Sequence, residues 1–418
     1  MRIIADLHIH SRYSRATSRE MNLDSLSLWA GLKGINLLGT GDFTHPAHLA
    51  SIEEKLEPDG RGLFALRTGG GKNPVRFMLT AEVSNIYSQG GKTRRVHNLI
   101  FAPSIEAVKK MNSAFAKLGN INSDGRPIFG FSSQDLIKIV LDSSPDAMLV
   151  PAHAWTPWFS IFGSKSGFDS IEECFGDYAK HIHAIETGLS SDPQMNWGLS
   201  GLDGITLISN SDAHSPSKLG REANVFDCNL DYHEITKIIK EKDIEKFLFT
   251  IEFFPEEGKY HYDGHRECGV RLSPDETSRA GRICSVCGKE VTVGVMSRVL
   301  ELADRPLGFI PENAIPARHI IPLDEILAQS LDCGVNSVKV KRSYKRLVAE
   351  SPEFDILLNM PQCEIDRLSG AKVAEAIARM RNGDVNITPG FDGEFGKIEI
   401  FRGNEVAAPG SAPQIRLF

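Results

Sequence analysis

Histidines and carboxylates recur along the first half of the chain, beginning with the segment Asp6-Leu7-His8-Ile9-His10. On a β-strand, residues 6, 8 and 10 point to the same face. Two imidazoles and a carboxylate on one face are costly to bury unless a metal ion or hydrogen-bond partners satisfy them. A single histidine in such a strand is more often an ordinary core residue. The pair at this spacing favours a metal site instead.

Further histidines and acids follow at the ends of apolar segments. They occur in GTGDFTHP, TAEVSNIY, RRVHNLIF, LVPAHAW and ISNSDAHS. The candidate metal ligands in these segments are Asp42, His45, Glu82, His97, His153, Asp212 and His214. Each alone could be a capping or hydrogen-bonded residue, but their joint occurrence predicts a metal centre. Mixed histidine and carboxylate sites suit Zn²⁺, Mn²⁺ or Fe²⁺, and carboxylate-rich positions also accept Mg²⁺.

Two or three divalent metals in such a centre would support phosphoester hydrolysis. Metals that share a bridging carboxylate can clamp a phosphate, activate a water molecule and stabilise the leaving oxygen. The sequence contains no GxSxG, no GxxxxGK[ST] and no glycine fingerprint for dinucleotides. We therefore expect a metal-dependent phosphoesterase in which His8, His10, Glu82 and Asp212 are the catalytic residues.

Short β-like segments and amphipathic helical segments alternate up to about residue 255, and these elements must position the ligands. Strands are expected at residues 2–9, 35–42, 76–84, 95–102, 147–153, 183–187, 205–211 and 246–254. Helices are expected at residues 23–34, 104–118, 132–142 and 231–242. Such alternation requires a parallel sheet, either a barrel or an open doubly wound sheet. Polar residues at the strand ends favour a barrel, because its strands bring their carboxyl ends to one rim.

A second metal motif lies at His265, Cys268, Cys284 and Cys287. Ligands separated by two residues form turns that wrap a tetrahedral metal, so this spacing predicts one structural zinc ion. His261 is an alternative to His265, although the HxxC spacing favours His265. We expect a catalytic barrel at residues 1–255, a zinc module at 256–295 and a small mixed α/β unit at 296–418.

The basic segment SVKVKRSYKRLV at residues 337–348 favours nucleic acid as a partner. It contains Lys341, Arg342, Lys345 and Arg346 around Tyr344, and it has no acidic residue. Basic residues interleaved with an aromatic ring suit phosphate contacts and base stacking. The alternative is a solvated helix face. The C-terminal unit is accordingly expected to serve DNA binding or an accessory role.

Length and charge set weak limits on these predictions. A chain of 418 residues suggests two or three domains. Its formal net charge of −7 argues mildly against nucleic acid, but bound cations would neutralise acids that serve as ligands. No apolar run approaches the ~20 residues that cross a bilayer. We expect a cytoplasmic protein without membrane contact.

The ordered segments DLHIH, GTGDFTHP, AE, HNL, AHAW and SDAH resemble the PHP (polymerase and histidinol phosphatase) family over residues 1–255. The resemblance implies a distorted (β/α)7, TIM-like barrel with a multinuclear metal centre. It implies a first metal at His8, His10, Glu82 and Asp212, a second at Glu82, His97 and His153, and a third at His45 and His214. Two departures affect the third site: SRYSRAT lacks a usual ligand, and Asp42-Phe43 replaces Asp-His. Asp42 is therefore either a ligand or a residue behind one.

Over essentially its full length, the chain resembles one branch of that family, the endonuclease Q family of DNA repair nucleases. The resemblance is carried by HAWTPWFSIFGSKSGFDSIEECF, ETGLSSDPQMNW, DGHRECGVRLSP and PGFDGEFGKIEIF. It implies cleavage of double-stranded or single-stranded DNA 5′ to uracil, hypoxanthine, xanthine and abasic sites. A damaged base would be flipped into a pocket beside the metals. A sliding clamp is a further candidate partner.

Several residues after His153 are candidates for substrate contact. Trp155, Trp158 and Phe159 would supply aromatic surfaces, and Ser164 and Lys165 could contact phosphate. For each aromatic residue, packing between barrel and helix is the alternative. The alternative function is a small-molecule phosphoesterase of the histidinol-phosphate phosphatase type. That function would leave the zinc module and the C-terminal unit without a role.

Overall fold

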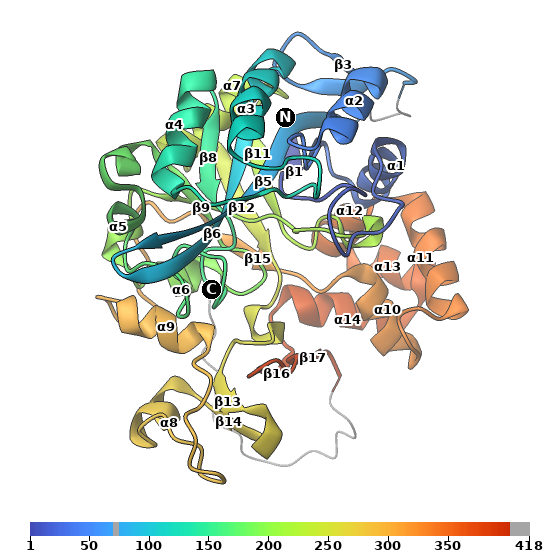
Figure 1. Ribbon diagram of the computed structural model, residues 1–418. Coiled ribbons are helices and arrows are strands. Elements are labelled where there is room, and N and C mark those ends of the chain that lie inside the picture. Colours follow the sequence, from blue (N-terminus) through green and yellow to red (C-terminus); the bar gives the residue numbers. More distant parts are fainter. Residues whose placement is uncertain (70–74, 402–418) are drawn as a thin grey trace.

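The structure is a computed structural model that describes residues 1–69 and 75–401 (Figure 1). Its largest part is a barrel with helices packed around the outside. The barrel strands are β1 (Arg2–Asp6), β2 (Leu37–Gly39), β5 (Arg76–Gln89), β6 (Lys92–Ala102), β8 (Met148–Pro151), β9 (Ala184–Glu186) and β10 (Thr206–Ile208). These strands overlap the segments in which the sequence predicts them, and the distorted (β/α)7 barrel is confirmed.

Parallel and antiparallel ladders join the strands in order around the barrel. β1, β2 and β5 are parallel, whereas β6 is antiparallel to both β5 and β8. β9 and β10 form a parallel pair. Beyond the strand ends, the amide of Ala154 donates to the carbonyl of Glu186 at 2.9 Å, and Ile9 pairs with Ala213. These two links connect β8 to β9 and β10 to β1, which closes the barrel.

Helices surround the barrel between successive strands (Figure 1). They are α1 (Leu23–Lys33), α2 (Pro46–Lys55), α3 (Ile105–Leu118), α4 (Ser133–Ser143), α5 (Ile171–Phe175), α6 (Pro193–Asn196) and α7 (Tyr232–Glu241). Ser132 and Asp135 begin α4 with reciprocal side-chain hydrogen bonds to the backbone, each 3.1 Å long. On α7, Ile235, Ile238 and Ile239 form the buried apolar face that the helical spacing predicts. Among the described helices, none has the length and apolarity of a membrane-spanning segment.

A strand that the sequence analysis did not predict, β11 (Ala223–Asp227), lies beside β1. It pairs antiparallel with β1 and with β12 (Phe247–Glu252), and β15 (Ala317–His319) extends this sheet. Asn224 interrupts the apolar pattern of β11, which conceals the strand in the sequence. The buried Asn224 side chain accepts from the Ser209 amide at 2.9 Å and donates to the Ser209 carbonyl at 2.7 Å. The short strands β3 (Leu56–Pro58), β4 (Phe64–Leu66) and β7 (Ile128–Phe129) add to the sheet at β5.

The described part of residues 296–418 is mainly helical and packs beside the barrel (Figure 1). Its helices are α9 (Val295–Leu302), α10 (Leu323–Leu331), α11 (Val338–Glu350), α12 (Glu353–Leu358), α13 (Gln362–Ser369) and α14 (Ala371–Arg381). A hairpin of β16 (Asn386–Thr388) and β17 (Lys397–Glu399) follows. Residues 402–418 of this predicted unit lie outside the described residues.

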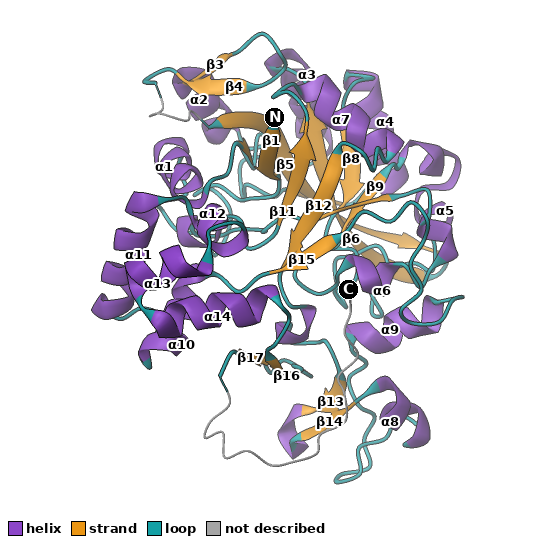
Figure 2. Cartoon of the chain, turned by 180° about the vertical axis from the view of Figure 1, so that it is seen from behind, coloured by secondary structure: helices purple, strands orange, loops and turns teal. Residues whose placement is uncertain are grey.

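The predicted zinc module extends away from the barrel (Figure 2). It contains the antiparallel hairpin of β13 (Asp263–His265) and β14 (Val270–Leu272), followed by α8 (Pro274–Arg279). The turn between β16 and β17 contacts the start of this module. The amide of Tyr262 donates to the Gly390 carbonyl at 2.9 Å, and the amide of Arg266 donates to Asp392 at 2.7 Å. The C-terminal hairpin therefore fastens the module to the rest of the molecule.

Candidate metal centre

The carboxylate of Glu82 on β5 is buried between two groups of histidines. Its Oε2 atom lies 3.2 Å from Nε2 of His10 and 3.7 Å from Nε2 of His8. Its Oε1 atom lies 2.8 Å from Nδ1 of His97 and 3.0 Å from Nε2 of His153. One carboxylate therefore faces two adjacent donor groups, as a bridging ligand does in a two-metal site.

Strand register brings the members of these groups together. Glu82 and His97 are diagonal neighbours on one face of the β5–β6 ladder. The β-bridge beyond β1 and β10 brings His10 to Asp212, whose Oδ1 lies 3.1 Å from Nε2 of His10. The same Oδ1 lies 3.6 Å from Nε2 of His8. The first group thus contains two imidazoles and two carboxylates, and the second contains two imidazoles and the shared Glu82.

Two further carboxylates orient the histidines of the first group. Nδ1 of His8 lies 3.0 Å from both oxygens of Glu186, and Nδ1 of His10 lies 3.0 Å from Oδ1 of Asp42. A carboxylate that holds the proton on Nδ1 leaves the Nε2 lone pair available to a metal. Both Nε2 atoms are buried, and neither has a hydrogen-bond partner among the described residues. This donor set fits divalent metal ions.

Asp42 is placed behind His10 and does not face the cluster as a ligand. Its Oδ2 accepts hydrogen bonds from the amide of Ser11 at 2.6 Å, from the hydroxyl of Ser11 at 2.7 Å and from Ser14 at 2.8 Å. Burial alone would raise the pKa of Asp42, but His10, His48 and the hydroxyl of Ser11 lower it to about 2. Of the two roles that the sequence left open for Asp42, this geometry favours the orienting role.

The two residues expected to hold a third metal contact different neighbours. His214 lies with His10 and Asp212: its ring is 4.6 Å from that of His10, and its Nδ1 is 3.7 Å from Oδ1 of Asp212. His45, the residue that precedes the first turn of α2, instead stacks on Tyr13 with ring centroids 4.6 Å apart. His45 belongs to none of the metal-binding groups among the described residues.

Surrounding charges keep Glu82 ionised. Burial by itself raises its pKa, but the guanidinium of Arg126, which is charged at pH 7, lowers the pKa well below the usual range. The Nη1 atom of Arg126 lies 2.8 Å from Oε2 of Glu82. Burial lowers the pKa of His97 to about 4, so its ring is neutral at pH 7, which is the form that binds metals.

Strained backbone marks this site. Asp42, His153, Phe159 and Asp212 have φ angles of 45°, 30°, 62° and 47°. Positive φ is uncommon for non-glycine residues and concentrates where the surrounding structure enforces it, often at functional sites. Close packing also requires Gly188, since a Cβ there would lie 2.6 Å from the Cβ of His153. The site is therefore held rigidly around these residues.

Sequence reasoning missed Glu186 and Arg126. Glu186 is the last residue of β9, so an acid at the end of an apolar strand was the available signal. Glu186 also accepts from the amide of His153 at 2.8 Å and from Asn210 at 2.9 Å. Arg126 lies in the loop before β7, where its neighbours Gly125 and Pro127 give no sign of a site. The contact between Arg126 and Glu82 can be recognised only once the loop is folded.

The proposed substrate contacts after His153 divide into two sets. Trp155 is a correction: it is 1% exposed, and its indole nitrogen donates to Asn196 at 2.8 Å, so it is a packing residue. Trp158 and Lys165 are exposed, and Ser164 is partly buried. The Phe159 ring lies 4.7 Å from that of His97. Trp158, Phe159, Ser164 and Lys165 thus stay candidates.

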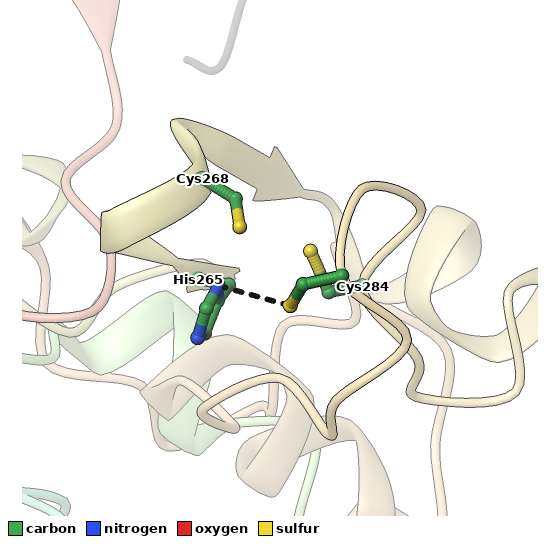
Figure 3. A group of neighbouring side chains, drawn as sticks. His265, Cys268 and Cys284 are labelled. Carbon is green, nitrogen blue, oxygen red and sulfur yellow. Dashed lines mark hydrogen bonds between the residues drawn. The ribbon is translucent and has the colours of Figure 1, made fainter.

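The predicted zinc ligands form a second cluster in the module (Figure 3). The candidate ligand atoms of His265, Cys268, Cys284 and Cys287 all lie within 4.8 Å of one another. The amide of Gly288 donates to the Cys284 carbonyl at 2.9 Å and closes the turn between the paired cysteines. The backbone amide of Cys287 lowers the pKa of Cys284 to about 7, which favours the metal-binding thiolate. His261 is buried outside this cluster.

The basic segment forms α11, and its side chains point in two directions. Lys341, Arg342, Lys345 and Arg346 are exposed. Tyr344 is only 9% exposed, and its hydroxyl donates to Glu353 at 2.6 Å. The stacking role suggested for this ring is therefore wrong, since the ring faces the core. The exposed basic face remains available for phosphate contacts.

Comparison with known sequences finds relatives along the whole chain. The family model "MJ0043 C-terminal domain" matches residues 322–384, which form α10 to α14. The uncharacterized protein YqxK of Bacillus subtilis is 30% identical over 413 residues, spanning 95% of this chain and 99% of that protein. The uncharacterized protein MJ0043 of Methanocaldococcus jannaschii is 33% identical over 257 residues, which are 59% of this chain but 31% of that protein.

Two solved structures match the entire fold. The lesion-specific endonuclease PfuEndoQ from Pyrococcus furiosus has a TM-score of 0.84 and 31% identity, with 97% of this chain and 98% of that chain covered. Endonuclease Q in complex with a 27-mer duplex substrate, with an abasic lesion at the active site, has a TM-score of 0.83 and 32% identity. That match covers 97% of this chain and 99% of the other.

Proposed function

The chain belongs to the endonuclease Q family, and we propose that it cuts DNA on the 5′ side of deaminated bases and abasic sites. It is a metal-dependent endonuclease. The observation that carries the chemistry is Glu82, whose two oxygens face two separate histidine groups. Uracil, hypoxanthine and xanthine are the deaminated bases in the proposal.

The donor atoms support two catalytic metal ions. His8, His10, Glu82 and Asp212 would hold one, and Glu82, His97 and His153 would hold the other. Metals bound there would supply Lewis acidity and a water molecule of lowered pKa for attack on phosphorus. Zn²⁺, Mn²⁺ and Mg²⁺ are the candidates.

A third ion has an incomplete donor set. His10, Asp212 and His214 are close enough to form a group. However, Nδ1 of His10 is already bonded to Asp42, and its Nε2 serves the first group. Asp212 and His214 are the donors that remain, which is fewer than a protein site for such a metal ordinarily uses. We therefore propose two metals rather than three.

Other residues would orient the metal ligands or contact the substrate. Glu186 and Asp42 keep the two imidazoles oriented, with their Nδ1 protons directed to carboxylates. The Arg126 guanidinium lies beside Glu82, and the side chain is 30% exposed, so it can contact the phosphate that is cut. The exposed basic face of α11 would contact DNA phosphates away from the cut.

The lesion itself must leave the base stack to reach the metals. Phe159 lies against His97, and Trp158 is exposed next to it in the chain. We propose that these two aromatic residues border the pocket that receives the flipped nucleotide, with Ser164 and Lys165 near its phosphate. A small-molecule phosphoesterase could use the same metals. The zinc cluster and the match along the full length favour DNA instead.

A cleavage assay on matched duplexes tests the proposal. Each duplex carries one uracil, hypoxanthine, xanthine or abasic site, and an undamaged duplex serves as the negative control. We expect a nick 5′ to the lesion that leaves a 3′-hydroxyl and a 5′-phosphate, in the presence of Mg²⁺, Mn²⁺ or Zn²⁺. Chelator, Asp212→Asn and His8→Ala should each abolish it. Metal-loaded protein that hydrolyses a small phosphomonoester but leaves every lesion duplex intact would contradict the proposal.

A further inference from the structure

Exposed aromatic side chains continue from the metal centre onto the zinc-module side of the molecule. They begin with Trp158, which is 37% exposed, and end with Phe395, which is 70% exposed. Tyr260 and Lys259 lie between them in space. We call these four residues the aromatic stripe.

The loop that carries Trp158 is tied to the second histidine group on both sides of this residue. The Thr156 hydroxyl lies 3.3 Å from Nδ1 of His153 and donates to the Trp158 carbonyl at 2.8 Å. The amide of His97 donates to the Phe159 carbonyl at 3.1 Å. Trp158 is therefore fixed at the rim of the metal centre.

This loop has little freedom to move. Phe159 has a φ of 62°, which a bulky side chain adopts only when neighbouring contacts enforce it. A Cβ at Gly163 would lie 2.4 Å from the Thr156 carbonyl oxygen, so the loop returns on itself in close contact. The Trp158 ring is thus presented on a rigid support, which is the form that binding surfaces require.

The remaining members of the stripe come from two other segments. The Tyr260 ring packs against Trp158 edge to face, with ring centroids 5.5 Å apart. The neighbouring ammonium group of Lys259 lies 4.5 Å from the centroid of the Phe395 ring. The amide of Gly393 donates to the Lys259 carbonyl at 2.9 Å and holds these segments together. A loop of the barrel, the start of the zinc module and the C-terminal hairpin therefore build one surface.

This combination of groups matches unpaired nucleotides. Single exposed apolar residues are common, whereas contiguous ones mark binding surfaces. Aromatic faces accept bases of any sequence by stacking, and an adjacent ammonium group suits the phosphate between them. Binding of a peptide would not require the stripe to begin beside the metal ligands. Binding of DNA that is opened at the cutting site does require this proximity.

We propose that the stripe stacks the bases that become unpaired around the lesion and so keeps the duplex open while the lesion occupies the metal centre. The inference rests on the proposed function and adds Tyr260, Lys259 and Phe395 to the residues that contact DNA. It also gives the zinc module and the C-terminal hairpin a role, since they carry three of the four residues of the stripe. Loss of stacking should therefore harm cleavage only where base pairs must be opened.

The test compares one lesion in two settings. An abasic site is placed either in a fully paired duplex or within a bubble of unpaired bases, and kcat/KM is measured for both substrates. Trp158→Ala and Phe395→Ala should each lower kcat/KM on the paired duplex about tenfold or more, as expected when a stacked base is lost. On the bubble the loss for Phe395→Ala should be less than about threefold. Trp158→Ala should lose activity on the bubble as well, because Trp158 also borders the pocket for the flipped nucleotide. Trp158→Phe should restore most of the activity on the duplex.

Controls separate this inference from its premise. Phe309→Ala removes an exposed aromatic residue outside the stripe and should leave kcat/KM unchanged on both substrates. Thermal melting of each variant should match the wild type. If the wild type cuts the duplex and the stripe variants cut it equally well, the inference fails while the proposed function stands. Equal losses of kcat/KM on duplex and bubble for Phe395→Ala also overturn it. A wild type that cuts neither substrate overturns the proposed function and the inference with it.

Discussion

The ammonium group of Lys33 on α1 lies 2.9 Å from the carboxylate of Glu353 on α12, and both side chains are almost fully buried. The same carboxylate accepts from Tyr344 at 2.6 Å and from the Leu323 amide at 3.0 Å. This ion pair joins the barrel to three helices of the C-terminal unit. The two parts are therefore joined by a buried polar contact at this point.

Replacing Lys33 with Met should strongly destabilise the protein. The substitution leaves the Glu353 carboxylate buried without its cation, which costs roughly 3–5 kcal/mol of unfolding free energy. Lys237→Ala is the matched control, because its pair with Glu241 is exposed and should contribute less than about 1 kcal/mol. Urea denaturation measures both values. A loss for Lys33→Met no larger than that of the control would contradict this account.

Glu186→Gln should weaken metal binding without changing a ligand. The carboxylate on Nδ1 of His8 sets the orientation and basicity of that imidazole. We expect the affinity for the first metal to fall about 10- to 100-fold. Calorimetric titration of the metal-free protein with Mn²⁺ or Zn²⁺ measures the change. Glu106→Gln, on the exposed surface of α3, should leave the affinity unchanged.

The buried Glu252 should make the protein less stable as pH rises. Burial raises its pKa to about 8, above the ordinary value of 4.5. Between these two pH values the unfolded chain loses this proton while the folded protein keeps it, so rising pH favours unfolding. Above pH 8 this contribution is constant. The stability contributed by the protonated group is therefore full below about pH 4.5 and is lost progressively up to about pH 8.

Glu252→Gln replaces the protonated acid with a neutral group of similar shape and removes this dependence. Urea denaturation at pH 6 and pH 8.5 should show a smaller loss of stability for the variant than for the wild type, by at least ~1 kcal/mol. Parallel curves for the two proteins across this range would show that Glu252 does not hold the proton.

Substitution of the zinc-module ligands should remove the structural zinc ion without removing the catalytic metals. Cys287→Ser and His265→Ala should each lower the zinc content by about one ion per chain, because structural zinc needs four ligands. His261→Gln should keep that ion, since His261 lies outside the cluster. Elemental analysis decides the outcome. Zinc lost from His261→Gln but kept in His265→Ala would reverse the ligand assignment.

The sequence predicted the ligands better than the residues that orient them. His8 and His10 were visible because a spacing of two would place both on one strand face, although β1 ends at Asp6 and both histidines follow it. Glu186 was not, because its partner His8 lies 178 positions away and meets it only when the barrel closes. Tyr344 was misassigned although a signal existed. Val340, Tyr344 and Leu347 recur at helical spacing and form the buried face of α11.

The exposed face of α11 should contribute to DNA affinity through charge alone. Lys341 and Lys345 lie one helical turn apart on its solvent side. If both contact phosphates, Lys341→Ala with Lys345→Ala should reduce the slope of log affinity against log salt by about 1.8, or about 0.9 for each contact. Fluorescence anisotropy with an undamaged duplex measures this slope at several salt concentrations. Lys237→Ala on α7, whose side chain is also exposed, is the control and should leave the slope unchanged. The reduction should be the same for damaged and undamaged duplexes, because phosphate contacts carry no information about the base. An unchanged slope for the double variant would remove α11 from the DNA-binding surface.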